Sequence, residues 1–143
     1  MSELFVWTQE YSVDVAEMDE QHKQFVKLGN DVIAYVKDSA SGASDPDALR
    51  LLLHRLGDYA LYHLGSEEEY FEKFGCENTD RHLFAHKQFR ETLHTYMSRY
   101  EQGSSNAHEF AEEIASFCVK WLLTHILSMD KSYTTCFHVH KKY

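Results

Sequence analysis

Four stretches of the chain repeat hydrophobic residues at intervals of three and four, the period of a helix with one buried face. We expect helices over roughly residues 14–38, 46–74, 79–101 and 106–129. Asp45 is the expected N-cap of the second helix, and Pro46, the only proline, suits its first position because proline lacks an N–H. Loops at 39–46 and 101–106 are short.

Helices joined by short loops favour an all-α fold, an up-down-up-down four-helix bundle. Residues 1–13 carry aromatic side chains without a sustained period, so we expect an extended N-terminal arm packed across the bundle. A chain of 143 residues is long enough for one hydrophobic core, and a single domain over 1–143 is therefore expected.

Histidines and carboxylates interrupt the apolar stripes of all four predicted helices. Up-down-up-down topology places the starts of the first and third helices at the same end as the ends of the second and fourth. The polar residues fall at these places, and pairs four residues apart share a helix face. The set consists of His22, His63, Glu67, His82, His86, His125 and Asp130.

Seven polar groups in one core need compensation, because burying an unpartnered polar group costs roughly 2–7 kcal/mol. A hydrogen-bonded histidine–carboxylate network is the alternative for any single residue. For the whole set we favour metal coordination, since neutral imidazole and carboxylate are both ligands. Seven ligands exceed one octahedral ion, so we expect two ions that share Glu67 and Asp130, one ion being coordinatively open. Iron suits these ligands; manganese, cobalt and zinc stay open.

Composition limits the partners and the location. The chain has 23 acidic and 14 basic residues, a net charge of −9, which argues against nucleic acid and anionic membranes. It has neither an apolar run of about 20 residues nor a signal-peptide pattern, so we expect a cytoplasmic protein. Cys76, Cys118 and Cys136 are odd in number and lack CxxC spacing, so we expect reduced thiols, with Cys118 in the core.

Four stretches resemble the hemerythrins, in particular the bacterial single-domain forms: DEQHKQF (19–25), HLGSEE (63–68), HLFAH (82–86) and WLLTHILSMD (121–130). The resemblance implies a non-haem di-iron centre with an oxo or hydroxo bridge. It implies His82, His86 and His125 on one iron, His22 and His63 on the other, and Glu67 and Asp130 as bridges. It further implies an oxygen-binding protein rather than an enzyme, in which O2 binds reversibly as hydroperoxide at the two-histidine iron for storage, delivery or sensing.

The resemblance also places Trp121, Leu122 and Ile126 around the bound O2, with ordinary core packing as the alternative. Leu64 stands where the family commonly has phenylalanine, and Gly65 follows it, so we expect a roomier or more mobile pocket.

Two other functions stay open, a di-iron enzyme acting on peroxide or nitric oxide and an iron-handling protein. No residue is an evident general acid at the open iron. A signalling or oxygenase partner would have to be a separate protein. His138 and His140 offer a secondary metal site in the tail, although a frayed terminus is the favoured interpretation.

Overall fold

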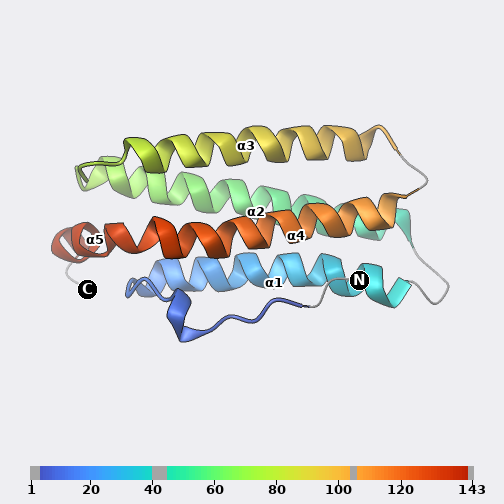
Figure 1. Cartoon of the computed structure of the whole chain (residues 1–143), viewed down its shortest axis with the longest axis horizontal. Helices are drawn as coiled ribbons and strands as arrows, with labels where there is room; N and C mark the ends of the chain where they lie inside the picture. The colour runs from blue at the N-terminus through green and yellow to red at the C-terminus, as the bar shows by residue number, and fades with distance from the viewer. Residues whose placement is uncertain (1–3, 40–44, 104–105, 142–143) are drawn as a thin grey trace.

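The computed structural model describes residues 4–39, 45–103 and 106–141, and all regular structure in these ranges is helical. Four long helices lie side by side along the molecule and alternate in direction (Figure 1). They are α1 (Ala16–Ser39), α2 (Pro46–Lys73), α3 (Asp80–Glu101) and α4 (Ala107–Ser128); two 3-10 turns, η1 (Gln9–Tyr11) and η2 (Asp130–Tyr133), and α5 (Thr134–Lys141) complete the fold. The predicted all-α four-helix bundle is confirmed.

The predicted start of α2 is also observed. Pro46 is the first helical residue, and the Asp45 carboxylate accepts a hydrogen bond from the backbone N–H of Asp47. Most of the expected loop before it, at residues 40–44, and residues 104–105 of the loop between α3 and α4 lie outside the described residues.

The N-terminal arm is present and is fixed to α1. The backbone N–H of Phe5 donates to Asn30 Oδ1 at 2.8 Å, and Asn30 Nδ2 donates to the carbonyl of Phe5 at 2.9 Å. Further along the arm, the ring of Trp7 stacks near the ring of His22, with 6.2 Å between centroids. The arm therefore runs along the outside of α1 to the end of the bundle that carries the histidines (Figure 1).

The buried face of α4 differs in part from the stripe that the sequence suggested. That stripe combined Phe110, Ile114, Phe117, Trp121, His125 and Ser128. In the structure Ser128 is exposed, and the fully buried positions include Ala115, Cys118, Val119, Leu122 and Ile126. Because α4 packs against both α1 and α3, its three aromatic residues, Phe110, Phe117 and Trp121, instead meet α3 through Phe89 and Tyr96.

The backbones of α1 and α4 approach closely at Gly29. A Cβ atom at this glycine would lie 2.2 Å from Val119 Cγ2, whose own side chain is fully buried. The β-branched valine has little rotamer freedom with which to move away. Gly29 is therefore required by the packing, whereas a Cβ atom at Gly65 would meet nothing within 4 Å.

The C-terminal segment corrects two expectations. Residues 134–141 form α5, whereas a frayed terminus was expected, and Cys136 on α5 forms a disulfide bond with Cys76 in the turn between α2 and α3. The expectation of reduced thiols was therefore wrong for this pair, because two cysteines 60 residues apart in sequence are brought together only by the fold. Cys118 is free and buried, as predicted.

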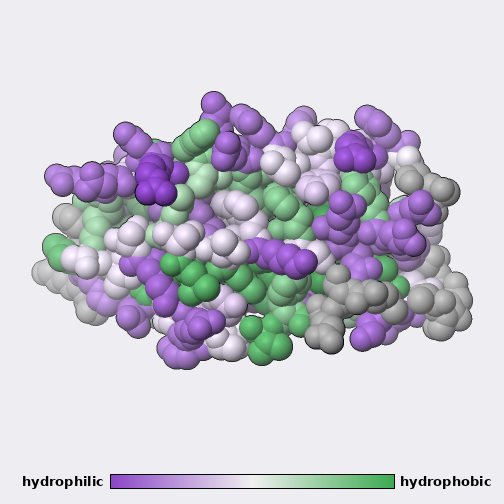
Figure 2. Space-filling model, in the orientation of Figure 1, coloured by the Kyte–Doolittle hydropathy of each residue, from purple (hydrophilic) through white to green (hydrophobic). Residues whose placement is uncertain are grey.

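The surface carries many hydrophilic side chains on the face shown in Figure 2, with hydrophobic residues gathered between them. No helix in the described ranges combines the length and the apolar character needed to cross a bilayer. The disulfide bond does not favour the expected cytoplasmic location, since persistent disulfides are uncommon in the cytosol.

We expect Gly29→Ala to lower the free energy of unfolding by about 1–3 kcal/mol, because the added methyl group overpacks the contact with Val119. The matched control, Gly65→Ala, gains helix propensity without a clash and should raise stability by up to about 1 kcal/mol. Chemical unfolding of both variants checks the prediction. Equal stabilisation by the two substitutions would contradict the close approach of α1 and α4.

Removing the disulfide in the Cys76→Ser/Cys136→Ser double variant should lower the free energy of unfolding by about 2–5 kcal/mol while helix content persists. The reason is that the unfolded chain regains the freedom of a loop that spans 60 residues of sequence. Alkylation of the unfolded, unreduced protein, followed by mass spectrometry, should modify Cys118 alone. Three modified thiols without reductant would show that the bond is absent.

Candidate metal centre

All seven predicted residues meet in the core at one end of the bundle. They come from α1, the C-terminal half of α2, the start of α3, the end of α4 and the turn η2. None of the seven side chains has more than a few per cent of its surface exposed. Their nitrogen and oxygen atoms form two groups in which each atom lies within 4.8 Å of the others: Glu67, His82, His86, His125 and Asp130 in one, and His22, His63, Glu67 and Asp130 in the other.

Glu67 and Asp130 belong to both groups because each carboxylate divides its two oxygens between them. Glu67 Oε2 faces His63 Nε2 at 3.4 Å and His22 Nε2 at 3.6 Å, whereas Oε1 faces His86 Nε2 at 3.2 Å. Likewise Asp130 Oδ2 lies 3.2 Å from His22 Nε2, and Oδ1 lies 2.8 Å from His82 Nε2. This is the arrangement that two bridging carboxylates between two cations require.

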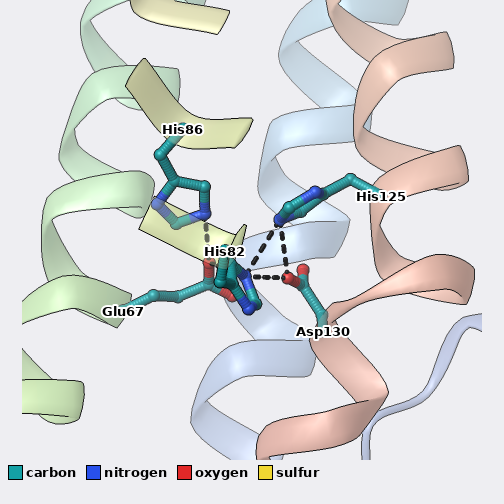
Figure 3. A group of neighbouring side chains, drawn as sticks. All are labelled: Glu67, His82, His86, His125 and Asp130. Atoms are coloured by element: carbon teal, nitrogen blue, oxygen red, sulfur yellow. Dashed lines mark hydrogen bonds and ion pairs between the residues drawn. The ribbon is translucent and has the colours of Figure 1, made fainter. Parts of the chain in front are cut away.

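His125 completes the larger group, as the side chains drawn in Figure 3 show. Its Nε2 lies 2.9 Å from Asp130 Oδ1 and 3.0 Å from His82 Nε2. Two ligands at right angles on one metal ion, each at about 2.1 Å, are also about 3 Å apart. The contact between the two ring nitrogens therefore has the spacing of neighbouring ligands.

Hydrogen bonds on the far sides of two rings determine which nitrogen faces the cluster as an acceptor. Nδ1 of His63 donates to Gln21 Oε1 at 2.7 Å, and Nδ1 of His86 donates to Glu68 Oε2 at 2.8 Å. Each neutral ring then presents the lone pair of Nε2 to an oxygen of Glu67. Two acceptors facing each other repel unless a cation, either a proton or a metal ion, lies between them.

Several of these buried atoms form no hydrogen bond within the described part of the chain. They include both ring nitrogens of His22, Nε2 of His63 and of His86, Oε1 of Glu67, and both oxygens of Asp130. Buried polar atoms in native proteins are almost always partnered. Because these unpartnered atoms, apart from Nδ1 of His22, point toward one another, the donor set fits cations held between them.

The electrostatics of the protein alone favour positive charge at this place. Burial lowers the pKa of His22, but Asp130 and Glu67 outweigh burial and raise this pKa to about 9. Burial would raise the pKa of Glu67, yet the neighbouring histidines hold it well below its usual value. Burial and the charge of Glu67 would raise the pKa of Asp130, yet hydrogen bonds from His125, His22 and His82 hold it below its usual value. The carboxylates therefore stay ionised, and cations must balance them.

Three polar residues contact the cluster although the sequence did not predict a specific role for any of them. Gln21 contacts His63, and Glu68 contacts His86; Glu68 was expected to be either solvated or adjacent to a ligand. Tyr133 in η2 is buried, and its hydroxyl donates to Glu67 Oε2 at 2.8 Å. Only their positions in the sequence could have indicated these contacts: Gln21 precedes His22, Glu68 follows Glu67, and Tyr133 lies one turn after Asp130.

The residues expected to surround O2 lie close in sequence to histidines of the cluster. Trp121 is partly exposed, and its ring stacks on that of His125 with 4.4 Å between centroids and 13° between planes. Leu64, Leu122 and Ile126 are fully buried, Leu64 beside His63 on α2 and the other two around His125 on α4. Their role as a wall of the O2 pocket stays a prediction.

His138 does not join the cluster. Nε2 of His138 contacts the backbone carbonyl of Asp14, and the side chain of His140 lies outside the described residues. Metal-ligand groupings among the described residues are limited to the two groups that share Glu67 and Asp130.

Comparison with known proteins agrees with this geometry. The model of the hemerythrin HHE cation-binding domain matches residues 13–136. A bacteriohemerythrin of Clostridium acetobutylicum is 22% identical over 130 residues, which cover 91% of this chain and 98% of the relative. Bacteriohemerythrins of Pseudomonas aeruginosa (26% identity; 90% of this chain and 78% of the relative) and Methylococcus capsulatus (26%; 93% and 96%) are also similar. The match spans most of the chain, including all seven clustered residues, and the chain therefore belongs to the hemerythrin family.

Proposed function

We propose that this protein holds two iron ions in the buried cluster and binds O2 reversibly there, for storage, delivery or sensing. His82, His86 and His125 bind one ion, His22 and His63 bind the other, and Glu67 and Asp130 bridge the two. The observation that carries the proposal is the division of each carboxylate between the two groups of histidines. A single ion would use only one side of each carboxylate.

Iron is the metal proposed on ligand chemistry and on family membership. Imidazole and carboxylate without thiolate suit iron among the first-row metals. The similar proteins that carry the name bacteriohemerythrin support the same choice. When bound, an iron pair supplies the two electrons that O2 takes up and recovers them when the gas leaves.

The number of ligands differs between the two sides and suggests where O2 binds. The group with three histidines offers five ligand atoms with the bridging oxygens, whereas the group with two histidines offers four. The second ion therefore has more coordination positions open to a small ligand. The proposed O2 position is on the side of His22 and His63.

The protein contributes a buried and enclosed site. At most 1% of the side-chain surface is exposed in five of the clustered residues: His22, His63, Glu67, His86 and Asp130. Leu64, Leu122 and Ile126 supply the proposed apolar wall, and Trp121 covers His125 from the outside. Excluding water and acids from the centre favours release of the gas over irreversible oxidation of the metal.

The cysteines argue against thiol-based peroxide chemistry as an alternative. Cys76 and Cys136 are joined in the disulfide bond, and burial raises the pKa of Cys118 to about 12. A thiol so rarely ionised is a poor nucleophile. Peroxide or nitric oxide turnover and iron handling are therefore the outcomes that the following test must separate from O2 binding.

The test begins with iron content and an optical spectrum. We expect two irons per chain, and we expect the reduced protein, exposed to air, to develop a charge-transfer band that disappears again under argon. His63→Ala should retain one iron and lose the oxygenated band while helicity persists. His94→Ala, which removes an exposed histidine of α3, is the control and should behave as wild type. An unchanged oxygenated spectrum in His63→Ala, or steady consumption of peroxide or nitric oxide well above that of free iron, would overturn the proposal.

Removing the metal should destabilise the bundle, because the buried carboxylates and imidazoles lose the cations that balance them. A ligand present at about 100 times its dissociation constant contributes about 2.7 kcal/mol, so we expect the melting temperature to fall by roughly 5–10 °C after chelation. Calorimetry before chelation, after it and after re-addition of ferrous iron measures the effect. An iron-handling protein should instead lose both ions to a mild chelator with little change in melting temperature.

A further inference from the structure

The hydrogen-bond partners outside the ligands carry different charges on the two sides of the cluster. On the side of the ring that faces away from the cluster, Nδ1 of His86 donates to the carboxylate of Glu68. The corresponding Nδ1 of His63 donates to the neutral amide of Gln21. These contacts have nearly the same length, 2.8 Å and 2.7 Å, so the difference lies in charge rather than in distance.

Glu68 is itself held in place by an ion pair. Arg90 Nη1 donates to Glu68 Oε2 at 2.7 Å, and Arg90 Nη2 donates to Oε1 at 2.9 Å. Paired bonds of this kind are the geometry of a guanidinium with an ionised carboxylate. Because Arg90 lies one turn beyond His86 on α3 and Glu68 lies on α2, the two helices together fix the carboxylate behind the ring. The Glu68 side chain is about one quarter exposed, with 26% of its surface accessible.

Gln21 has a comparable support on its own side. Its amide oxygen accepts from His63 Nδ1, and its Nε2 donates to the hydroxyl of Ser66 at 3.1 Å. Gln21 is buried, with 7% of its surface exposed. Each ring is therefore oriented by a short hydrogen bond, but only the partner of His86 is a carboxylate.

A carboxylate behind an imidazole increases the basicity of the opposite nitrogen, and loss of such a partner typically lowers metal affinity 10–100-fold. We propose that Glu68, braced by Arg90, is a positioning residue that makes His86 a stronger ligand than His63, so that the two metal positions differ in affinity. The position of His82, His86 and His125 then holds its ion more tightly, and the position of His22 and His63 exchanges its ion more easily. This inference rests on the proposed function, because it assumes that both positions hold iron.

The arrangement separates two tasks. The more firmly held ion anchors the centre, while the ion with the open positions keeps a neutral outer partner and a weaker donor. Exchange of Gln21 and Glu68 should therefore bring the rates at which the two ions are lost closer together. Tyr133 does not break this asymmetry, since it donates to the shared carboxylate Glu67 and not to a histidine.

The experiment follows iron loss from the loaded protein. Wild-type protein loaded anaerobically with ferrous iron is mixed with a coloured iron chelator, and the two ions should leave in two phases. In Glu68→Gln the slow phase should become 10–100-fold faster while the fast phase is unchanged. Gln21→Glu, which adds the missing charge, should slow the fast phase by a similar factor and serves as an independent variant if Glu68→Gln fails to fold.

The variant Arg90→Gln removes the ion pair between α2 and α3 but leaves the Glu68 carboxylate. It therefore distinguishes an effect of Glu68 on His86 from an effect of the ion pair on the packing of the two helices. It should accelerate the slow phase less than Glu68→Gln does. A fall in melting temperature in Glu68→Gln without any change in the two phases would reduce Glu68 to a structural contact and overturn the inference. Equal acceleration of both phases would overturn it too. Wild-type protein that contains no second iron would instead overturn the proposed function itself.

Discussion

The structure depends on two carboxylates placed in the core among five imidazoles. Glu67 and Asp130 are fully buried and remain ionised, and ring nitrogens face their oxygens from opposite sides at 2.8–3.8 Å. Burial of such charges is tolerated only with compensating positive charge. The need for cations between these atoms therefore governs the rest of the fold at this end of the bundle.

The bundle satisfies this need by its topology. The ends of α2 and α4 and the starts of α1 and α3 meet at one pole, and η2, which follows α4, begins with Asp130. The N-terminal arm adds Trp7 around the pole, η2 adds Tyr133, and α5 adds Phe137. The disulfide bond ties α5 to the turn before α3, so the segment that carries the Tyr133 contact to Glu67 is anchored at both of its ends.

The two sides of the cluster are not equivalent, and the difference extends beyond the number of histidines. One side has five ligand atoms and a charged partner behind His86, whereas the other has four and a neutral partner behind His63. In the centre that we propose, both differences favour the same outcome, a firmly held ion on the first side and a more open one on the second. A centre that takes up and releases a small ligand without losing its metal benefits from that division.

The sequence by itself determined the helices and the candidate cluster, because helical periodicity places His63 with Glu67, and His82 with His86, on shared inward faces. It missed the exposure of Ser128, the pairing of Cys76 with Cys136 and the contact of Tyr133 with Glu67. Periodicity orients a side chain relative to the axis of its own helix. Which residue of another helix it meets depends on how the helices are rotated and shifted against each other, and only the tertiary structure decides that.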